Sequence, residues 1–288
     1  MPRTLAHLPI AATLAFAVSA TPAAARPRDD ARPPRAKVKT PRGGLDIVGD
    51  RDTRPRRIRV MLGPQFNPAF PGDDRMRLSP IVSLSKARGN DPFPFGAPGD
   101  GNALTLIHAG RFEAGPMFQL TGKRDADDLG GGLPRVSRSL EPGVFAQVWP
   151  IDAVRLRADV RHGVTGHNGL ISQLAADYVA RDGDRWLFSL GPRVQLSDRR
   201  YQRAWFGVDA DTAARTGLAR FDPSGGAHAV GAVGRAIVAL DQRWSVQAVG
   251  RWDRLIGDAG DSPIIGRADS RNQVSAGVAL GYTFTIGR

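Results

Sequence analysis

The 288-residue sequence contains no cysteine. Disulfide bonds, thiolate nucleophiles and cysteine-ligated zinc or iron–sulfur centres are therefore excluded. Long apolar runs are also missing, because no stretch after the N-terminal segment reaches the roughly 18 uncharged apolar residues that a membrane-spanning helix needs. Barrel strands cross membranes with a much weaker signal per segment, so this second absence argues only against membrane-spanning helices.

The N-terminal segment has the three parts of an export signal. Arg3 supplies the positive start, "LPIAATLAFAVSA" the apolar run, and Thr21–Ala25 the small-residue cleavage site. We therefore predict a signal peptide over residues 1–25, with a buried core helix as the alternative. Export fits the missing cysteines, because the periplasm is an oxidising compartment.

A basic, proline-rich segment follows over residues 26–57. It holds eleven Lys and Arg against five Asp, which is half of the net charge of +12. So few apolar residues cannot form a packed core, and the segment is predicted to be a disordered linker. The alternative is a basic arm that touches anionic lipid or cell-wall polymer. Nucleic acid is not an expected partner of an exported chain whose basic segment lacks aromatic residues.

From residue 58 onward apolar residues recur with a period of two, which is the period of a β-strand. In "VRLRADVRHG" the residues Val154, Leu156 and Val160 share one face, and arginine and aspartate occupy the other. The runs have about 10–12 residues, the length that a tilted strand needs to cross a bilayer. Aromatic residues near the ends of these runs suit interfacial girdles. They are Trp149, Trp186, Trp205, Trp244, Trp252, Tyr282 and Phe284.

Short polar turns alternate along the chain with longer loops. "WPIDA", "RDGDR", "LSDRR" and "LDQR" are predicted to be tight turns, and segments such as "GNDPFPFGAPGDG" and "KRDADDLGGGLPRVS" are predicted to be long loops on the opposite side. Residues 103–108 and 111–122 are predicted to be two strands joined at "HAGR". The pattern predicts an all-β, transmembrane, antiparallel up-and-down barrel over residues 58–288, with about twelve strands and ten as the alternative.

Several stretches resemble the MipA/OmpV family of outer-membrane proteins, also called the MltA-interacting protein family. The likeness covers most of the chain from about residue 58. It is carried by "AGPMFQLTGKR" (114–124), "LEPGVFAQVWPIDAVRLRADVRHGVTGHNGL" (140–170), "DRWLFSLGPRVQLSDRRYQRAWFGV" (184–208), "RWSVQAVGRWDRLIGDAGDSPII" (243–265) and "SRNQVSAGVALGYTF" (270–284). The basic linker departs from a compact family member.

The resemblance implies an outer-membrane barrel with no established enzymatic activity. One member of the family is regarded as a scaffold between a lytic transglycosylase and a bifunctional penicillin-binding protein, and others are linked to osmotic or antibiotic responses and to adhesion. We therefore expect a chain located in the cell outer membrane, in contact with outer-membrane lipid, with murein enzymes as partners.

The second face of the strands carries charges that would line the lumen. In a small barrel such charges pair across the lumen and plug it, whereas an arginine-rich lumen that leaves a gap favours anions. The scaffold is therefore the first hypothesis and a narrow anion-favouring channel the second. The expected lumen charges are Glu141, Arg155, Arg157, Asp159, Arg161, Asp177, Arg193, Arg251, Asp253 and Arg254.

The stretch "DRLIGDAGDSPIIG" has acidic residues but lacks the ligand spacing of a calcium loop. We interpret it as a structural family signature in which Asp253 and Arg254 pair at the strand end and the glycines form turns. Its polar and turn residues are Asp253, Arg254, Asp258, Asp261, Ser262 and Pro263.

The sequence contains no recognisable set of catalytic residues or metal ligands. His162 and His167 lie five residues apart without further metal ligands nearby, and Ser172 and Asp177 fall on opposite faces of one strand. A nucleophile elbow and a phosphate-binding glycine loop are absent from the sequence. We expect no catalytic residues, no metal and no cofactor, and a lipid-modifying barrel enzyme is the third and most distant hypothesis.

Overall fold

The computed structural model describes residues 54–268 and 270–287. The predicted signal peptide and nearly all of the predicted linker lie outside the described residues. Most of the described chain forms one antiparallel sheet of twelve strands. The strands are β1 (Arg56–Pro68), β2 (Met76–Arg88), β3 (Asn102–Ala103), β4 (Ile107–Ala109), β5 (Phe112–Thr121), β6 (Ser139–Ile151), β7 (Val154–His162), β8 (Leu170–Asp182), β9 (Trp186–Ser197), β10 (Gly226–Ala239), β11 (Trp244–Leu255) and β12 (Asn272–Ile286).

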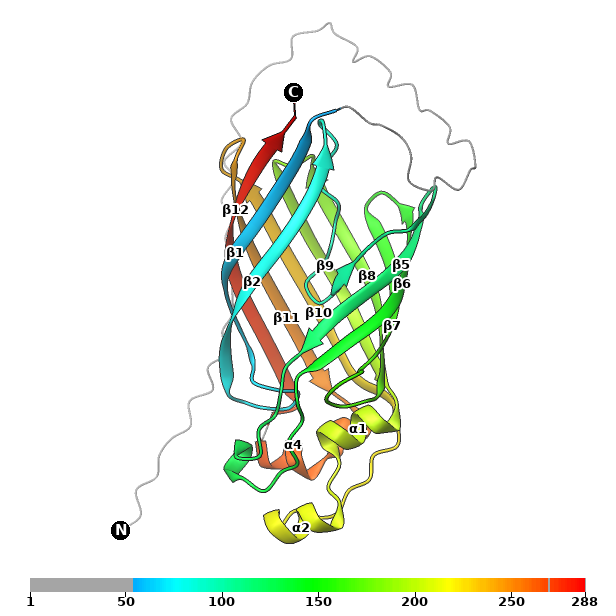
Figure 1. Ribbon diagram of the computed structural model, residues 1–288, viewed down its shortest axis with the longest axis vertical. Helices are drawn as coiled ribbons and strands as arrows, with labels where there is room; N and C mark the ends of the chain where they lie inside the picture. Colours follow the sequence, from blue (N-terminus) through cyan, green and yellow to red (C-terminus); the bar gives the residue numbers. More distant parts are fainter. Residues whose placement is uncertain (1–53, 269, 288) are drawn as a thin grey trace, which may run out of the picture. The chain divides into compact units, whose positions relative to one another are not determined.

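The sheet curls into a barrel whose strands follow the up-and-down order (Figure 1). Each strand from β5 to β12 pairs with its neighbour in sequence, and β12 returns to pair with β1. The all-β antiparallel barrel of about twelve strands is therefore confirmed. Two of the strands are very short, because the predicted strand at residues 103–108 is divided into β3 and β4 along the same edge of β5.

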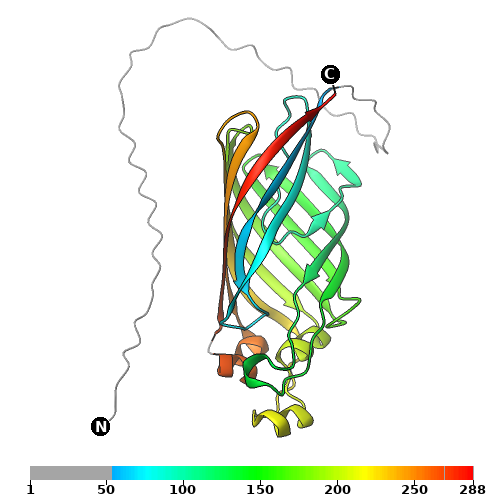
Figure 2. The same ribbon diagram turned by 60° about the vertical axis from the view of Figure 1, so that its left-hand side comes forward.

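The barrel is open along one seam. The order of strands begins with β2 and ends with β3, and within the described residues no ladder joins these two edges. Figures 1 and 2 show β2 and β5 diverging on either side of this seam. Pro80 lies in the edge strand β2, where a residue without a backbone N–H donor is tolerated.

The two ends of the barrel differ, as the alternation of turns and loops predicts. One end carries the start of β1, the end of β12 and the turns at residues 152–153, 183–185 and 240–243. The other end carries long connections with five short helices: η1 (Asp128–Gly130), α1 (Arg199–Phe206), α2 (Ala210–Thr216), α3 (Gly257–Asp261) and α4 (Pro263–Ala268). Outer-membrane barrels place short turns in the periplasm, so the helical end is the extracellular one.

One predicted turn and one predicted girdle residue are wrong. "LSDRR" is not a tight turn, because Asp198 accepts a hydrogen bond from the Tyr201 backbone N–H at 2.9 Å and caps helix α1. Trp205 is not part of an interfacial girdle, because it lies in α1 and is fully buried. Both errors arise where the chain leaves the strand period for a short helix.

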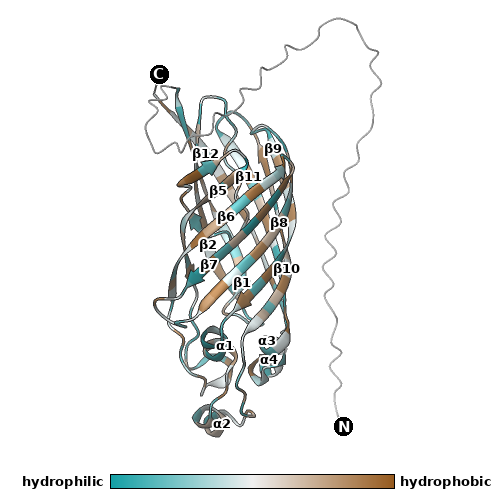
Figure 3. Ribbon diagram, turned by 90° about the vertical axis from the view of Figure 1, so that its right-hand side faces the viewer, coloured by the Kyte–Doolittle hydropathy of each residue, from teal (hydrophilic) through white to brown (hydrophobic). Residues whose placement is uncertain are grey.

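Apolar side chains point outward from the strands and polar ones point inward, the reverse of a soluble barrel. In β7, Leu156 and Val160 are 44% and 47% exposed, whereas Arg155 is fully buried. The outer surface therefore carries apolar residues along most strands, and apolar and polar residues follow one another along the strands in Figure 3. A contiguous apolar surface of this extent needs an apolar solvent, which the hydrocarbon of a bilayer supplies.

Helices cover the extracellular end of the barrel with an apolar core. Trp205 of α1 stacks on Phe70 with ring centroids 6.4 Å apart, and Ala259 of α3 and Ile265 of α4 pack in the same cluster. None of the helices in residues 54–268 and 270–287 is long and apolar enough to cross a membrane. We call the assembly of α1, α3, α4 and residues 69–75 the helical cap.

Candidate functional site: the charged lumen

Strand β7 supplies the central charges of the lumen, because its period-two pattern turns four of them to the inner face. Arg155, Arg157, Asp159 and Arg161 are all buried there. Burying an unpaired charge costs several kcal/mol, so each of these groups needs partners.

Arg155 is held by two carboxylates from different parts of the chain. Its guanidinium lies 2.6 Å from Asp177 on β8 and 2.7 Å from Asp100 in the segment after β2. Asp177 also accepts from Arg193 on β9 at 2.7 Å. Three strands and one loop are thus joined through charge-assisted hydrogen bonds, which are about twice as strong as neutral ones.

Arg157 makes fewer and weaker contacts. It donates to the side chain of Gln147 at 3.1 Å and to the backbone carbonyl of Asp100 at 3.1 Å, and it stacks over the Phe145 ring at 4.2 Å. Its ion-pair distances to Asp100 and Asp159 are both 4.0 Å. Arg157 therefore contributes a positive charge to the lumen, and the nearest carboxylates, those of Asp100 and Asp159, compensate this charge only from a longer distance.

A second cluster lies nearer the extracellular end. Arg161 contacts Glu141 at 2.7 Å and Asp159 at 2.9 Å. His167 Nδ1 accepts from the Gly169 backbone N–H at 3.1 Å, so its Nε2 carries the proton and donates to Glu141 at 3.0 Å. His162 points outward from β7 and takes no part. Within the part of the chain that the structure describes, no group of three or more residues could hold a metal ion.

The segment between β2 and β3 is the main departure from the sequence prediction. "GNDPFPFGAPGDG" is not an outward loop on the long-loop side, because it leaves the periplasmic end of β2 and folds into the lumen. We call residues 89–101 the inner loop. Figure 1 shows this segment inside the wall formed by β8, β9 and β10.

Aromatic residues anchor the inner loop against the periplasmic half of the barrel. Phe93 is 2% exposed and lies under Arg59, whose guanidinium carbon is 4.2 Å from the ring centroid. Phe95 packs edge-on against Trp149 at 5.9 Å and lies under Arg155 at 4.6 Å. Cation–π contacts gain strength when they are removed from water, as these are.

Backbone groups of the inner loop are satisfied by the barrel wall. Arg181 donates to the Phe93 carbonyl at 3.0 Å, and Arg235 donates to the Gly96 carbonyl. Asp184 accepts from the Phe93 N–H at 2.9 Å. Since hydrogen bonds and buried rings hold the loop along its length, the periplasmic half of the lumen is filled.

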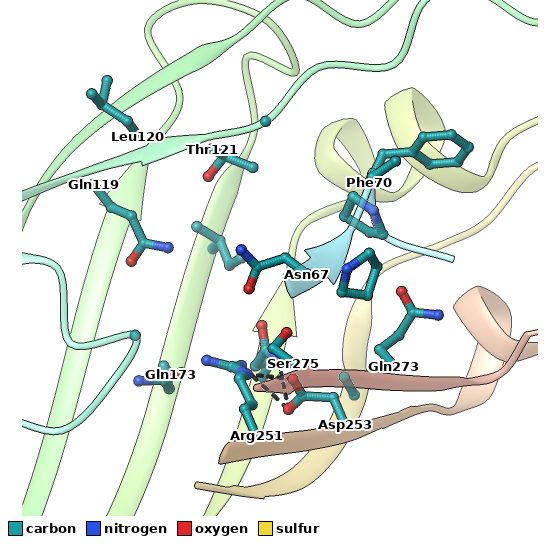
Figure 4. A pocket seen from close by; sticks show the side chains of 18 of the residues that line it. Asn67, Phe70, Gln119, Leu120, Thr121, Gln173, Arg251, Asp253, Gln273 and Ser275 are labelled. Carbon is teal, nitrogen blue, oxygen red and sulfur yellow. Dashed lines mark hydrogen bonds and ion pairs between the residues drawn. The ribbon is translucent and has the colours of Figure 1, made fainter. Parts of the chain in front are cut away.

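A cavity of about 640 Å³ remains between the inner loop and the helical cap. Figure 4 shows Arg251 and Asp253 of β11 forming an ion pair in its wall. Gly99 of the inner loop forms another boundary, where its φ of +88° and the nearby Arg251 guanidinium leave no room for a Cβ atom. The tip of the inner loop and Arg251 therefore pack directly on each other.

The family-signature loop is structural in its contacts. Asp258 accepts from the N–H and the hydroxyl of Ser224, both at 2.7 Å, and these hydrogen bonds lower the pKa of its carboxyl. Ser262 donates to the Phe206 carbonyl at 2.7 Å, which ties this loop to α1. Pro263 begins α4, a position that needs no backbone N–H. Asp261 pairs with Arg271 at 3.0 Å.

One pairing within that loop differs from the prediction. Asp253 pairs with Arg251, two residues away on the same inner face, and not with Arg254. Arg254 is exposed and donates to Asn272 at 3.3 Å, so it does not line the lumen. The period of two places neighbours in sequence on opposite faces, and the expected pair violates that rule.

Asp100, Phe93 and Phe95 complete the lumen network, and sequence patterns predict none of these three roles. Two phenylalanines in a loop rich in glycine and proline were the available sign, because solvated loops seldom carry such apolar side chains. Asp100 meets Arg155, 55 residues further along the chain, and Phe95 meets the similarly distant Trp149, so local patterns do not identify these contacts.

Comparison with known proteins identifies one matching family. A family model described as "MltA-interacting protein MipA" matches residues 60–284. No curated protein matches the sequence. Among solved structures, an outer-membrane channel from Pseudomonas putida F1 (COG4313) is 12% identical with a TM-score of 0.38, covering 83% of this chain and 100% of its own.

Two further solved structures are outer-membrane proteins of Pseudomonas aeruginosa. OprD is 12% identical with a TM-score of 0.33, covering 72% of this chain and 56% of its own. A FadL homologue is 9% identical with a TM-score of 0.32, covering 82% of this chain and 90% of its own.

Proposed function

Because the chain belongs to the MipA family and lies in the cell outer membrane, we propose that it is a scaffold for murein enzymes and does not conduct solutes. The family is described by its interaction with MltA, a lytic transglycosylase, and a lytic transglycosylase is therefore the first partner proposed for this chain. A penicillin-binding protein is proposed as the second. The predicted signal peptide would deliver the chain to the periplasm.

The observation that carries this proposal is the filled lumen. Asp100 at the tip of the inner loop is 6% exposed and lies between Arg155 and Arg157. A lumen crossed by buried ion pairs and aromatic rings supports anchoring over transport, since Arg155, Arg161 and Arg193 are engaged with carboxylates of the protein itself.

The periplasmic end supplies the surface for partners. The turn residue Asp152 is 95% exposed as a side chain, and Ile151 and Leu240 beside the turns are 57% and 63% exposed. The predicted basic linker joins β1 at this same end, because β1 begins there. Exposed apolar residues rimmed by charges are typical of protein interaction surfaces.

Co-purification from the cell envelope tests the proposal. Cross-linked membranes are solubilised in detergent, and the barrel is recovered through an affinity tag inserted in the exposed loop at residues 217–220, away from the periplasmic end. Recovery of a lytic transglycosylase, lost when Ile151, Asp152 and Leu240 are replaced by serine, is the expected result. Equal recovery with a variant changed only at Arg215 in the extracellular loop is the matched control. Failure to recover any murein enzyme would overturn the scaffold function.

A further inference from the structure

The cavity inside the barrel reaches the open seam. Its lining includes Arg77 and Ser79 from β2 and Gln119, Leu120 and Thr121 from β5, which are the two strands on either side of the seam. The short strand β3 covers β5 only at Met117 and Phe118, so the following three residues have no strand beside them on that edge among the described residues. In Figure 4, Gln119 and Leu120 lie on one side of the cavity and Asn67 of β1 on the other.

The outer mouth of this opening is apolar. Leu120 is 70% exposed, and across the seam Leu78 of β2 is 61% exposed. Leu78 points to the side of the sheet that faces lipid, since its neighbours Arg77 and Ser79 line the cavity, and Leu120 lies at the rim of the cavity. The opening lies near the extracellular ends of β2 and β5, at the depth of the outer leaflet. An alkyl chain can therefore rest here without leaving an apolar environment.

The interior behind the mouth is cationic and rich in hydrogen-bond donors. Arg77 and Arg138 line the cavity with exposed side chains. Arg77 acts on the Asp125 carboxylate only at longer range, and neither guanidinium forms a close ion pair within residues 54–268 and 270–287. Gln173 also lines the cavity, is 2% exposed, and its amide nitrogen has no hydrogen-bond partner in the structure. A buried donor without a partner costs about 1–3 kcal/mol, so this side of the cavity is suited to an acceptor.

We infer that the cavity binds a single-chain anionic amphiphile, which enters sideways from the outer leaflet through the seam between β2 and β5. The head group, a carboxylate or phosphate monoester, lies between Arg77, Arg138 and Gln173, and the chain extends outward past Leu78 and Leu120. A cavity of about 640 Å³ accommodates one chain with its head group. Gly99 of the inner loop and Phe70 and Tyr201 of the helical cap border the cavity on its other sides. This inference does not depend on the scaffold function.

Binding is measured with the full mature chain in lipid nanodiscs, using 11-(dansylamino)undecanoate as the fluorescent probe and palmitate as competitor. The double variant Arg77→Gln, Arg138→Gln should weaken binding about ten-fold, because two charge-assisted hydrogen bonds are lost. The matched control, Arg185→Gln with Arg243→Gln, removes two arginines from the opposite end of the barrel and should leave affinity unchanged. Hexadecanol, which has the chain without the charge, should compete at least ten-fold more weakly than palmitate.

The route is tested by labelling, which the absence of cysteine makes specific. In the Gln173→Cys variant, palmitate should protect the thiol from a membrane-soluble maleimide, and Ser79→Phe at the mouth should slow the labelling. Binding that is unchanged in the arginine variant, or equal competition by hexadecanol and palmitate, would overturn the inference. So would binding of lipid A from vesicles with no binding of palmitate or hexadecyl phosphate, since it would assign the site to a multi-chain lipid.

Discussion

Arg155 and Asp100 lie 2.7 Å apart inside the barrel, although 55 residues separate them in the sequence. Arg155 belongs to the barrel wall and Asp100 to the inner loop, so this ion pair is one of the contacts that join the loop to the barrel. Asp177 on β8 completes the arrangement by binding the same guanidinium at 2.6 Å. The wall thus carries a cation with one partner of its own and a second partner supplied by the inner loop.

Replacement of Asp100 tests this contact directly. Asp100→Asn should lower the free energy of unfolding by about 3–5 kcal/mol, because it leaves the buried arginines Arg155 and Arg157 with less compensating charge. Urea unfolding of the refolded barrel, followed by gel shift and tryptophan fluorescence, measures the change. The same substitution at the exposed Asp152 should change stability by less than about 1 kcal/mol. Equal effects at the two sites would refute the role of Asp100.

Removal of the inner loop should open the cavity to water from the periplasmic side. With residues 90–100 replaced by a glycine–serine linker, a charged, water-soluble maleimide should label Gln173→Cys in nanodiscs. The intact chain should resist labelling, because the loop fills the lumen and lipid covers the seam. A matched variant with residues 211–219 replaced in the same way should also resist. Equal labelling of all three chains would show that the inner loop does not seal the lumen.

The direction of the strand faces predicts a depth-dependent cost of charge. Ala158→Arg places a cation on the lipid-facing side in the middle of β7 and should destabilise the barrel by about 2–4 kcal/mol. His162→Arg, on the same face at the strand end, should cost only about 0–1 kcal/mol. Unfolding from lipid vesicles measures both. A larger cost at residue 162 than at residue 158 would contradict the membrane position.

Acid should loosen the extracellular connection between α1 and β10. Arg203 and Arg199 bind Asp222, and these hydrogen bonds hold the pKa of its carboxyl well below the ordinary 3.8. Because the pKa of this carboxyl is lower in the folded than in the unfolded chain, its ion pairs stabilise the fold fully at pH values above the unfolded-state pKa. This stabilisation is lost as pH falls through the folded-state pKa. Amide hydrogen exchange in residues 199–206, corrected for intrinsic rates, should be equally slow at pH 7 and pH 5 and faster below pH 3.

The variant Asp222→Asn supplies the control for that titration. At pH 7 the amides of residues 199–206 should exchange faster in this variant than in the native chain. Lowering the pH below 3 should then increase their exchange rate much less than it does in the native chain. Were the native chain and the variant to respond identically to acid, another group would be responsible for the pH dependence.

Strand positions and face directions could be predicted from the sequence because both follow from local chemistry. The alternation in β7 fixes which side chains point inward, and the turns at residues 152–153 and 183–185 fix the order of the neighbouring strands. Arg254 was predicted to line the lumen beside Asp253 and is exposed in the structure, because the period of two puts adjacent residues on opposite faces.

The inner loop could not be predicted, since its conformation depends on contacts formed only after the barrel closes around it. Phe95 meets Trp149 and Asp100 meets Arg155, and neither pair has a signature in the local sequence. The open seam could not be predicted either. The strand period is present on both sides of residues 89–101, and it does not show that the chain turns inward there before it rejoins the sheet.

The most direct test of the closed lumen is conductance of the detergent-refolded, full mature chain in planar bilayers. Folding is verified beforehand by circular dichroism and gel shift, and salt concentration and voltage are varied. The filled lumen predicts no steady single-channel steps from the folded barrel. Steady steps with a reversal potential that indicates anion selectivity would contradict it and would make the chain an arginine-lined channel.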